Sequence, residues 1–126
     1  MYGGTISGNN AKNIGGIMLT SGSFTMTGGE VSGNSATTSY GGIFGNGTII
    51  VGGTAVITGN TANSKPYNLG LANNQFITLD TPSSGMSIGV TMQTPGVFTT
   101  NTADGYLSYF SSDDSTNSQI TNIQWR

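Results

Sequence analysis

Short stretches in which apolar and polar residues alternate recur through the first part of the chain. In residues 23–26, Phe24 and Met26 are the apolar positions. The same alternation returns in residues 48–51 and in residues 76–79. Alternation with a period of two is typical of a strand with one buried face. Glycine recurs throughout and no apolar stripe follows the ~3.6-residue period of a helix, so the pattern predicts strands rather than helices.

A phrase that ends in Gly-Asn marks a longer period. Asn9, Asn34 and Asn60 each follow a glycine, and they lie 25 (34 − 9) and 26 (60 − 34) residues apart. Likewise, Gly-Gly-Ile ends at Ile17 and again at Ile43, 26 residues later (43 − 17). A fixed period of ~20–50 residues marks a repeat architecture, in which one unit buries its apolar face only against its neighbours. We therefore predict coils of 25–26 residues with three short strands each.

The fold that fits this period is an all-β, right-handed parallel β-helix, or β-solenoid. Equivalent residues of successive coils would then stand above one another at the ~4.8 Å spacing of neighbouring strands. The predicted inward-facing ladders are Ile6, Val31 and Ile57; Ile17, Ile43 and Leu69; Phe24, Ile49 and Ile77; and Met26, Val51 and Leu79. An antiparallel sandwich is the competing all-β fold, but hairpins do not require self-similarity at this period.

The Gly-Asn phrase itself is interpreted as a structural corner. We expect Asn9, Asn34 and Asn60 to form a ladder in which the side chains hydrogen-bond along the stack. Asparagine also tolerates left-handed backbone at turns, and the glycines beside it are expected to have positive φ.

The regular register breaks near residue 80. We divide the single domain into parallel coils over residues 1–92 and a C-terminal β cap over residues 93–126. A solenoid must cover its last coil or leave an open edge that recruits other strands. Four aromatic residues are expected to cover that coil: Phe98, Tyr106, Phe110 and Trp125.

Composition and charge narrow the possible partners. The net charge is −2 and the only cations are Lys12, Lys65 and Arg126, so we expect no nucleic-acid binding. No apolar run approaches the ~20 residues of a membrane span, so no membrane insertion is expected. The chain has no cysteine and no histidine, and we expect neither a metal site nor a cofactor. No signal peptide opens the sequence, and we interpret the chain as starting within a larger protein.

The repeats resemble a known group of proteins. Phrases of the form Gly-Gly-x-Ile/Val-Ser-Gly-Asn-x-Ala, at residues 3–11 and 28–36, are similar to the repeats of bacterial cell-surface, adhesin-like parallel β-helices. They are distantly similar to repeats of chlamydial polymorphic outer-membrane proteins and of autotransporter passengers. Residues 88–99 resemble the segment that closes such repeat blocks. The resemblance implies an extracellular or cell-surface location and a role in adhesion or surface scaffolding, and it carries over no catalytic residue.

The carboxylates do not form an enzyme-like pattern. Catalytic β-helices need clustered carboxylates together with a cationic or basic partner. The acidic residues here are scattered: Glu30, Asp80, Asp104, Asp113 and Asp114. The oxygen-rich loop at Asp113 and Asp114 lacks the spacing of a known calcium loop, and we interpret it as solvated. We therefore expect no enzymatic activity.

Two tyrosines are the candidate ligand-binding residues. Tyr40 and Tyr67 are 27 positions apart (67 − 40) and would sit on neighbouring coils at one corner. Exposed aromatic rings offer flat apolar faces with a polar tip, which suits the faces of sugars. The alternative is that both rings simply pack over the Gly-Gly corners.

The main hypothesis is a non-enzymatic surface or secreted module that displays polar and aromatic rows on a rigid rod. One alternative is a subunit of a head-to-tail filament, which self-associates by coil stacking through an uncapped first coil at Tyr2, Thr5 and Ile6. The other alternative is a carbohydrate-binding module, with host or cell-surface glycans as partners.

Overall fold

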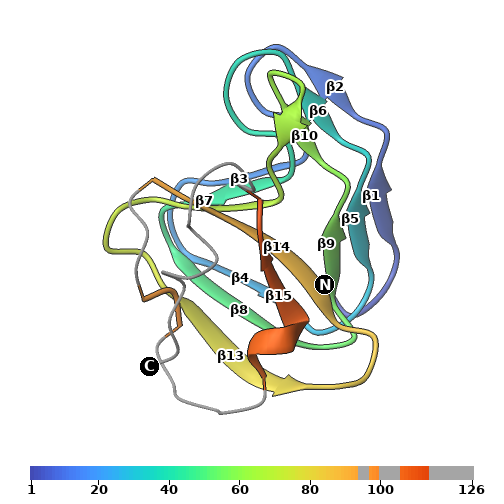
Figure 1. The fold of residues 1–126 in the computed structure, drawn as a ribbon, viewed down its shortest axis with the longest axis vertical. Coiled ribbons are helices and arrows are strands. Elements are labelled where there is room, and N and C mark those ends of the chain that lie inside the picture. Colours follow the sequence, from blue (N-terminus) through green and yellow to red (C-terminus); the bar gives the residue numbers. More distant parts are fainter. Residues whose placement is uncertain (94–96, 100–105, 114–126) are drawn as a thin grey trace.

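The chain winds about one axis in about four turns, and successive turns add parallel strands to the same walls (Figure 1). The computed structural model describes residues 1–93, 97–99 and 106–113. The all-β parallel solenoid predicted from the repeat is therefore confirmed.

The first turn contains β1 (Thr5–Ser7), β2 (Asn10–Ala11), β3 (Ile17–Leu19) and β4 (Ser23–Met26). The second turn contains β5 (Glu30–Ser32), β6 (Ser35–Ala36), β7 (Ile43–Gly45) and β8 (Thr48–Gly53). The third contains β9 (Val56–Thr58), β10 (Thr61–Ala62), β11 (Lys65–Pro66), β12 (Leu69–Leu71) and β13 (Ile77–Pro82). The remaining elements are β14 (Ser87–Met92), a short 3-10 helix η1 (Leu107–Tyr109) and β15 (Phe110–Ser112).

Three walls stack in the predicted register. The first wall is β1-β5-β9, the second is β3-β7-β12 and the third is β4-β8-β13. All four predicted apolar ladders are confirmed as directly paired residues. Their second- and third-turn members are buried, because alternation places them inside the solenoid and neighbouring turns cover them above and below. The first-turn residues Ile6, Ile17 and Phe24 are only half-buried.

The corner between the first two walls carries a small strand that the sequence pattern did not predict. The two-residue strands β2, β6 and β10 pair in parallel and form a separate lobe at the top of Figure 1. The alanine that follows each Gly-Asn lies in this ladder, with Ala11 beside Ala36 and Ala36 beside Ala62. Beyond β10 the chain reverses, because β11 pairs with β10 in antiparallel fashion and ends this sheet.

Strand β14 crosses from the first wall to the second without entering this lobe. Its first half pairs with β9, with Ile88 beside Ile57, and its second half pairs with β12, with Val90 beside Leu69. One strand thus joins two walls into a single 8-stranded sheet whose ends are β1 and β3. The first turn therefore supplies edge strands of every sheet: β1, β2, β3 and β4.

Aromatic residues pack on the last turn. The rings of Phe98 and Phe110 are buried and meet edge to face, with centroids 5.0 Å apart. Tyr106 is half-buried against the same core. The fourth residue expected in the cap, Trp125, lies outside the described residues, as does most of residues 93–126.

Gly42 stands where two turns approach closely. A Cβ atom at this position would overlap the Asn68 carbonyl oxygen and lie 3.0 Å from Asn60 Nδ2. Both neighbours are fixed, since Asn60 and Asn68 are buried. Gly42 of the Gly-Gly pair is therefore needed to leave space for the buried corner asparagine, and not only to allow a turn.

Gly42→Ala is expected to lower the free energy of unfolding by about 2–4 kcal/mol, because backbone or the buried asparagine must shift. Gly3→Ala is the matched control, since nothing lies within 4 Å of a Cβ at Gly3. Urea denaturation followed by circular dichroism measures both variants. Equal stability of the two would contradict this account of the corner.

Candidate functional site

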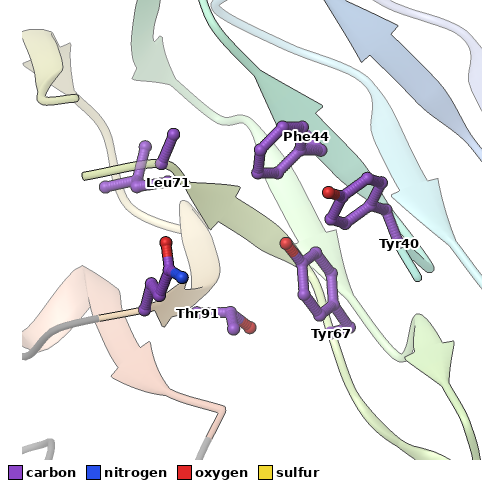
Figure 2. Close-up of a pocket in the computed structure, with 7 residues that line it drawn as sticks. Tyr40, Phe44, Tyr67, Leu71 and Thr91 are labelled. Atoms are coloured by element: carbon purple, nitrogen blue, oxygen red, sulfur yellow. The ribbon is translucent and has the colours of Figure 1, made fainter. Parts of the chain in front are cut away.

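The two candidate tyrosines lie side by side on the outer face of the second wall (Figure 2). Tyr40 precedes β7 and Tyr67 precedes β12, one turn later. Their ring centroids are 5.6 Å apart, at an interplanar angle of 53°. The structure thus brings these two residues together, as their spacing predicted.

Phe44 completes an aromatic cluster. It lies in β7 next to the inward-facing Ile43, so alternation turns its side chain outward. The rings of Tyr40 and Phe44 stack with centroids 4.0 Å apart and an interplanar angle of 9°. An apolar residue at an outward position was the sequence signal for this third ring.

The cluster borders a hollow of about 280 Å³. Figure 2 shows the Tyr67 hydroxyl directed into the space between Phe44, Leu71 and Thr91. Leu71 is buried and forms an apolar part of the wall, whereas Gln93 is exposed. The residues that line the hollow are Tyr40, Phe44, Tyr67, Leu71, Ala72, Thr91 and Gln93.

Gly70 interrupts a row of side chains, and the Tyr67 ring occupies the space that this leaves. Phe44, Gly70 and Thr91 are paired neighbours on successive strands of the second wall. A Cβ on Gly70 would overlap the hydroxyl end of Tyr67, so the Tyr67 ring lies over this glycine. Tyr67 therefore does pack on a glycine, as the alternative hypothesis held, but its partner is Gly70 rather than a Gly-Gly corner.

Tyr67 is held in its neutral form. Burial raises the pKa of its hydroxyl well above the usual range, and Tyr40 and Asp113 raise it further. A neutral phenol both donates and accepts hydrogen bonds, so Tyr67 offers a polar tip at the hollow across the physiological pH range.

The predicted asparagine ladder is present. Asn34 Oδ1 accepts hydrogen bonds from the Asn9 backbone N–H (3.1 Å) and from Asn9 Nδ2 (2.9 Å). Asn60 Oδ1 accepts the same pair from Asn34, at 3.1 and 2.9 Å. Each of these acceptors therefore holds both a main-chain and a side-chain donor of the turn before it.

The ladder continues through two residues that the repeat did not reveal. Asn68 Oδ1 accepts from the backbone N–H and from Nδ2 of Asn60, both at 2.9 Å. Asn68 in turn donates its backbone N–H (2.8 Å) and its Nδ2 (2.7 Å) to the carboxylate of Asp113. Thr91 Oγ1 donates to the same carboxylate at 2.6 Å. Asp113 is therefore an acceptor at the end of the ladder, and its interpretation as part of a solvated loop was wrong.

The backbone at the corner also differs from the expectation in one respect. Positive φ falls on the glycine before each ladder residue, at Gly8 (68°), Gly33 (63°) and Gly59 (69°), as predicted. The ladder asparagines themselves are not left-handed. Their role is in the side chain, because Asn34 and Asn60 are fully buried and also donate Nδ2 to the carbonyls of Ile6 and Val31, both at 2.9 Å.

The proposed assembly edge is the outer edge of β1. Tyr2 is 83% exposed, Thr5 is exposed and Ile6 is half-buried. Within the described ranges, β1 pairs only with β5.

The acidic residues of the described chain are separated. Glu30 begins β5 in the first wall, whereas Asp80 lies in β13 of the third wall. Among the described residues, no group of three or more histidine, cysteine, aspartate or glutamate side chains is placed to hold a metal ion. Asp104 and Asp114 lie outside the described residues.

Asn34→Asp is expected to lower the free energy of unfolding by about 3 kcal/mol or more. The change removes both Nδ2 hydrogen bonds and sets a carboxylate oxygen against Asn60 Oδ1 and the Ile6 carbonyl. The loss in free energy of unfolding relative to the parent chain should be smaller at acid pH, where a protonated carboxyl regains one donor. Asn46→Asp is the control, because Asn46 is exposed and outside the ladder. Chemical denaturation at two pH values measures both, and a pH-independent deficit would contradict the acceptor clash.

Alkaline titration should distinguish Tyr67 from an ordinary tyrosine. Because the folded pKa is raised, folding stabilises the protonated phenol, and stability is expected to fall as pH rises above ~10. Absorbance at tyrosinate wavelengths should show one late ionising group, which Tyr67→Phe removes. If Tyr67→Phe leaves the late step in place, another tyrosine is responsible.

Comparison with known proteins assigns neither a family nor a function to the chain. None of the described residues forms a helix that is long and apolar enough to cross a membrane. No family model, no curated protein and no solved structure shows a significant match to the chain.

Proposed function

We propose that this chain is a non-enzymatic, surface-displayed β-solenoid module that binds neutral carbohydrate in the hollow beside Tyr40, Phe44 and Tyr67. The observation that supports this most is the convergence of three rings from two turns around one hollow. Aromatic rings bind the apolar faces of sugars, while their polar tips and neighbouring groups bind hydroxyls.

The lining has the chemistry that such a ligand needs. The rings and Leu71 offer apolar surface, and the Tyr67 hydroxyl and the exposed Gln93 amide offer hydrogen bonds. The lining residues include no charged side chain, which favours a neutral polyhydroxyl ligand over an ion. The volume of about 280 Å³ lies near the lower limit of the ~300–1,000 Å³ common for small-molecule pockets, which suits a short saccharide.

The scaffold holds these groups in fixed positions. Phe44 and Thr91 belong to strands of one parallel sheet, and Tyr67 is held against Gly70 between them. A site that is already formed avoids the entropy cost of ordering its side chains on binding.

The proposal includes a cell-surface or extracellular location, in line with the resemblance of the repeats to adhesin-like proteins. A shallow site of this size binds weakly, and surface display overcomes that weakness through repeated contacts with a glycan-covered partner.

Binding is expected to require Tyr40. A glycan array followed by isothermal titration should find neutral saccharides whose affinity falls about twofold to twelvefold in Tyr40→Ala, since an aromatic contact contributes about 0.5–1.5 kcal/mol. Tyr2→Ala is the control, because Tyr2 is an exposed tyrosine away from the hollow. Phe44→Ala provides a second test at the same site. An array without any bound glycan, or equal binding by Tyr40→Ala and the parent chain, would retire the proposal.

A further inference from the structure

The asparagine ladder has a direction. At every step between described residues, the residue nearer the start of the ladder donates and the residue nearer Asp113 accepts. The last member is a carboxylate, which accepts three hydrogen bonds from Asn68 and Thr91 and, when ionised, has no hydrogen to donate. Within the part of the chain that the structure describes, the ladder therefore ends in acceptors.

Asn9 is the first member of the ladder, and its Oδ1 accepts no hydrogen bond from the described residues. Its backbone N–H and Nδ2 donate to Asn34 Oδ1, and Nδ2 also reaches the Ser7 carbonyl at 3.3 Å. In the three asparagines that follow, Oδ1 accepts two hydrogen bonds. No described residue donates to Asn9 Oδ1, and Asn9 is exposed.

Unpaired backbone surrounds this acceptor. In the second turn, the backbone N–H groups of Glu30, Ser35 and Thr37 donate to carbonyls of the first turn. The equivalent first-turn residues are Thr5, Asn10 and Lys12, which lie along the edge formed by β1 and β2. The first turn thus presents backbone donors at strand edges beside one side-chain acceptor.

We propose that this end of the solenoid binds a further coil of the same Gly-Asn repeat. The asparagine of the incoming coil donates its backbone N–H and its Nδ2 to Asn9 Oδ1. The strands of that coil pair in parallel with β1 and β2, and an apolar residue in the position of Val31 covers the half-buried Ile6. This partner is recognised by backbone pairing and by one amide, independently of the carbohydrate site.

The direction of the ladder selects against a second copy of this chain in head-to-tail contact. The ladder of such a copy ends in the Asp113 carboxylate, which would meet Asn9 Oδ1 with no hydrogen between the two oxygens. A head-to-head contact would oppose two Asn9 Oδ1 atoms. Apposed acceptors without a donor are unfavourable when desolvated, so the partner is a coil whose last ladder member is an amide.

The test uses a peptide with the sequence of residues 27–50 and the full chain labelled with ¹⁵N. We expect shift changes at Ile6, Asn9 and Ala11, and affinity about tenfold lower for the peptide that carries Asn34→Ala, since the Nδ2 donor is lost while the backbone N–H remains. The Asn46→Ala peptide is the matched control and should bind like the parent. In the Asn9→Ala chain, the difference between the Asn34→Ala and parent peptides should disappear, which isolates the pairing as a double-mutant cycle.

A fused coil avoids the cost of ordering a free peptide. Residues 27–50 placed directly before Met1 put Met1 in the position of Val51 and keep the period. The denaturation midpoint should rise in the fused chain, and Asn34→Ala in the added coil should cancel most of the gain.

Three results would overturn the proposal. The first is an unchanged denaturation midpoint in the fused chain. The second is equal affinity of the parent and Asn34→Ala peptides. The third is concentration-dependent self-association of the chain alone in sedimentation, which would make a second copy the occupant. Glycan binding is measured separately at Tyr40, so its failure and the failure of this proposal are distinguishable.

Discussion

A row of buried amides holds the corner of this solenoid together. Asn34 and Asn60 are fully buried, and burying an amide costs free energy unless its hydrogen bonds are made. Each Oδ1 binds two N–H groups of the turn before it, and each Nδ2 reaches both the next amide and a carbonyl of an earlier turn. The corner bends away from the walls to form its lobe, yet these bonds keep successive turns in one register. The apolar ladders and the Gly-Gly contacts then follow from that register.

The sequence predicted the parts of the fold that obey the period. Val31 pairs with Ile6 and with Ile57 because the coil length fixes which residues meet and the strand alternation fixes which face is buried. Asn68 and Asp113 escaped prediction because they join the ladder after the β10–β11 reversal. Asn68 follows Asn60 by only eight positions, so spatial neighbours there are not separated by one period. The path of β14 is likewise set by the loss of the lobe in the last turn.

The same limit applies to the candidate site. Tyr40 and Tyr67 could be paired from the sequence because they occupy similar positions on neighbouring turns. Thr91 and Gln93 could not, since they reach the hollow only through the crossing of β14 between two walls. Gly70 carries no side chain to signal a site, although its small size is what admits the Tyr67 ring.

The direction of the ladder also bears on how such a protein changes length. The asparagine of an internal turn accepts hydrogen bonds from the turn before it and donates the same set to the turn after it. Duplication or deletion of a whole turn between Asn9 and Asn60 therefore preserves every donor–acceptor match. Asp113 has no such freedom, because a carboxylate suits only the final position. The number of turns before Asn60 can therefore vary while Asp113 keeps its position at the end of the ladder. Related chains of this kind would then differ in length and share the same end of the ladder.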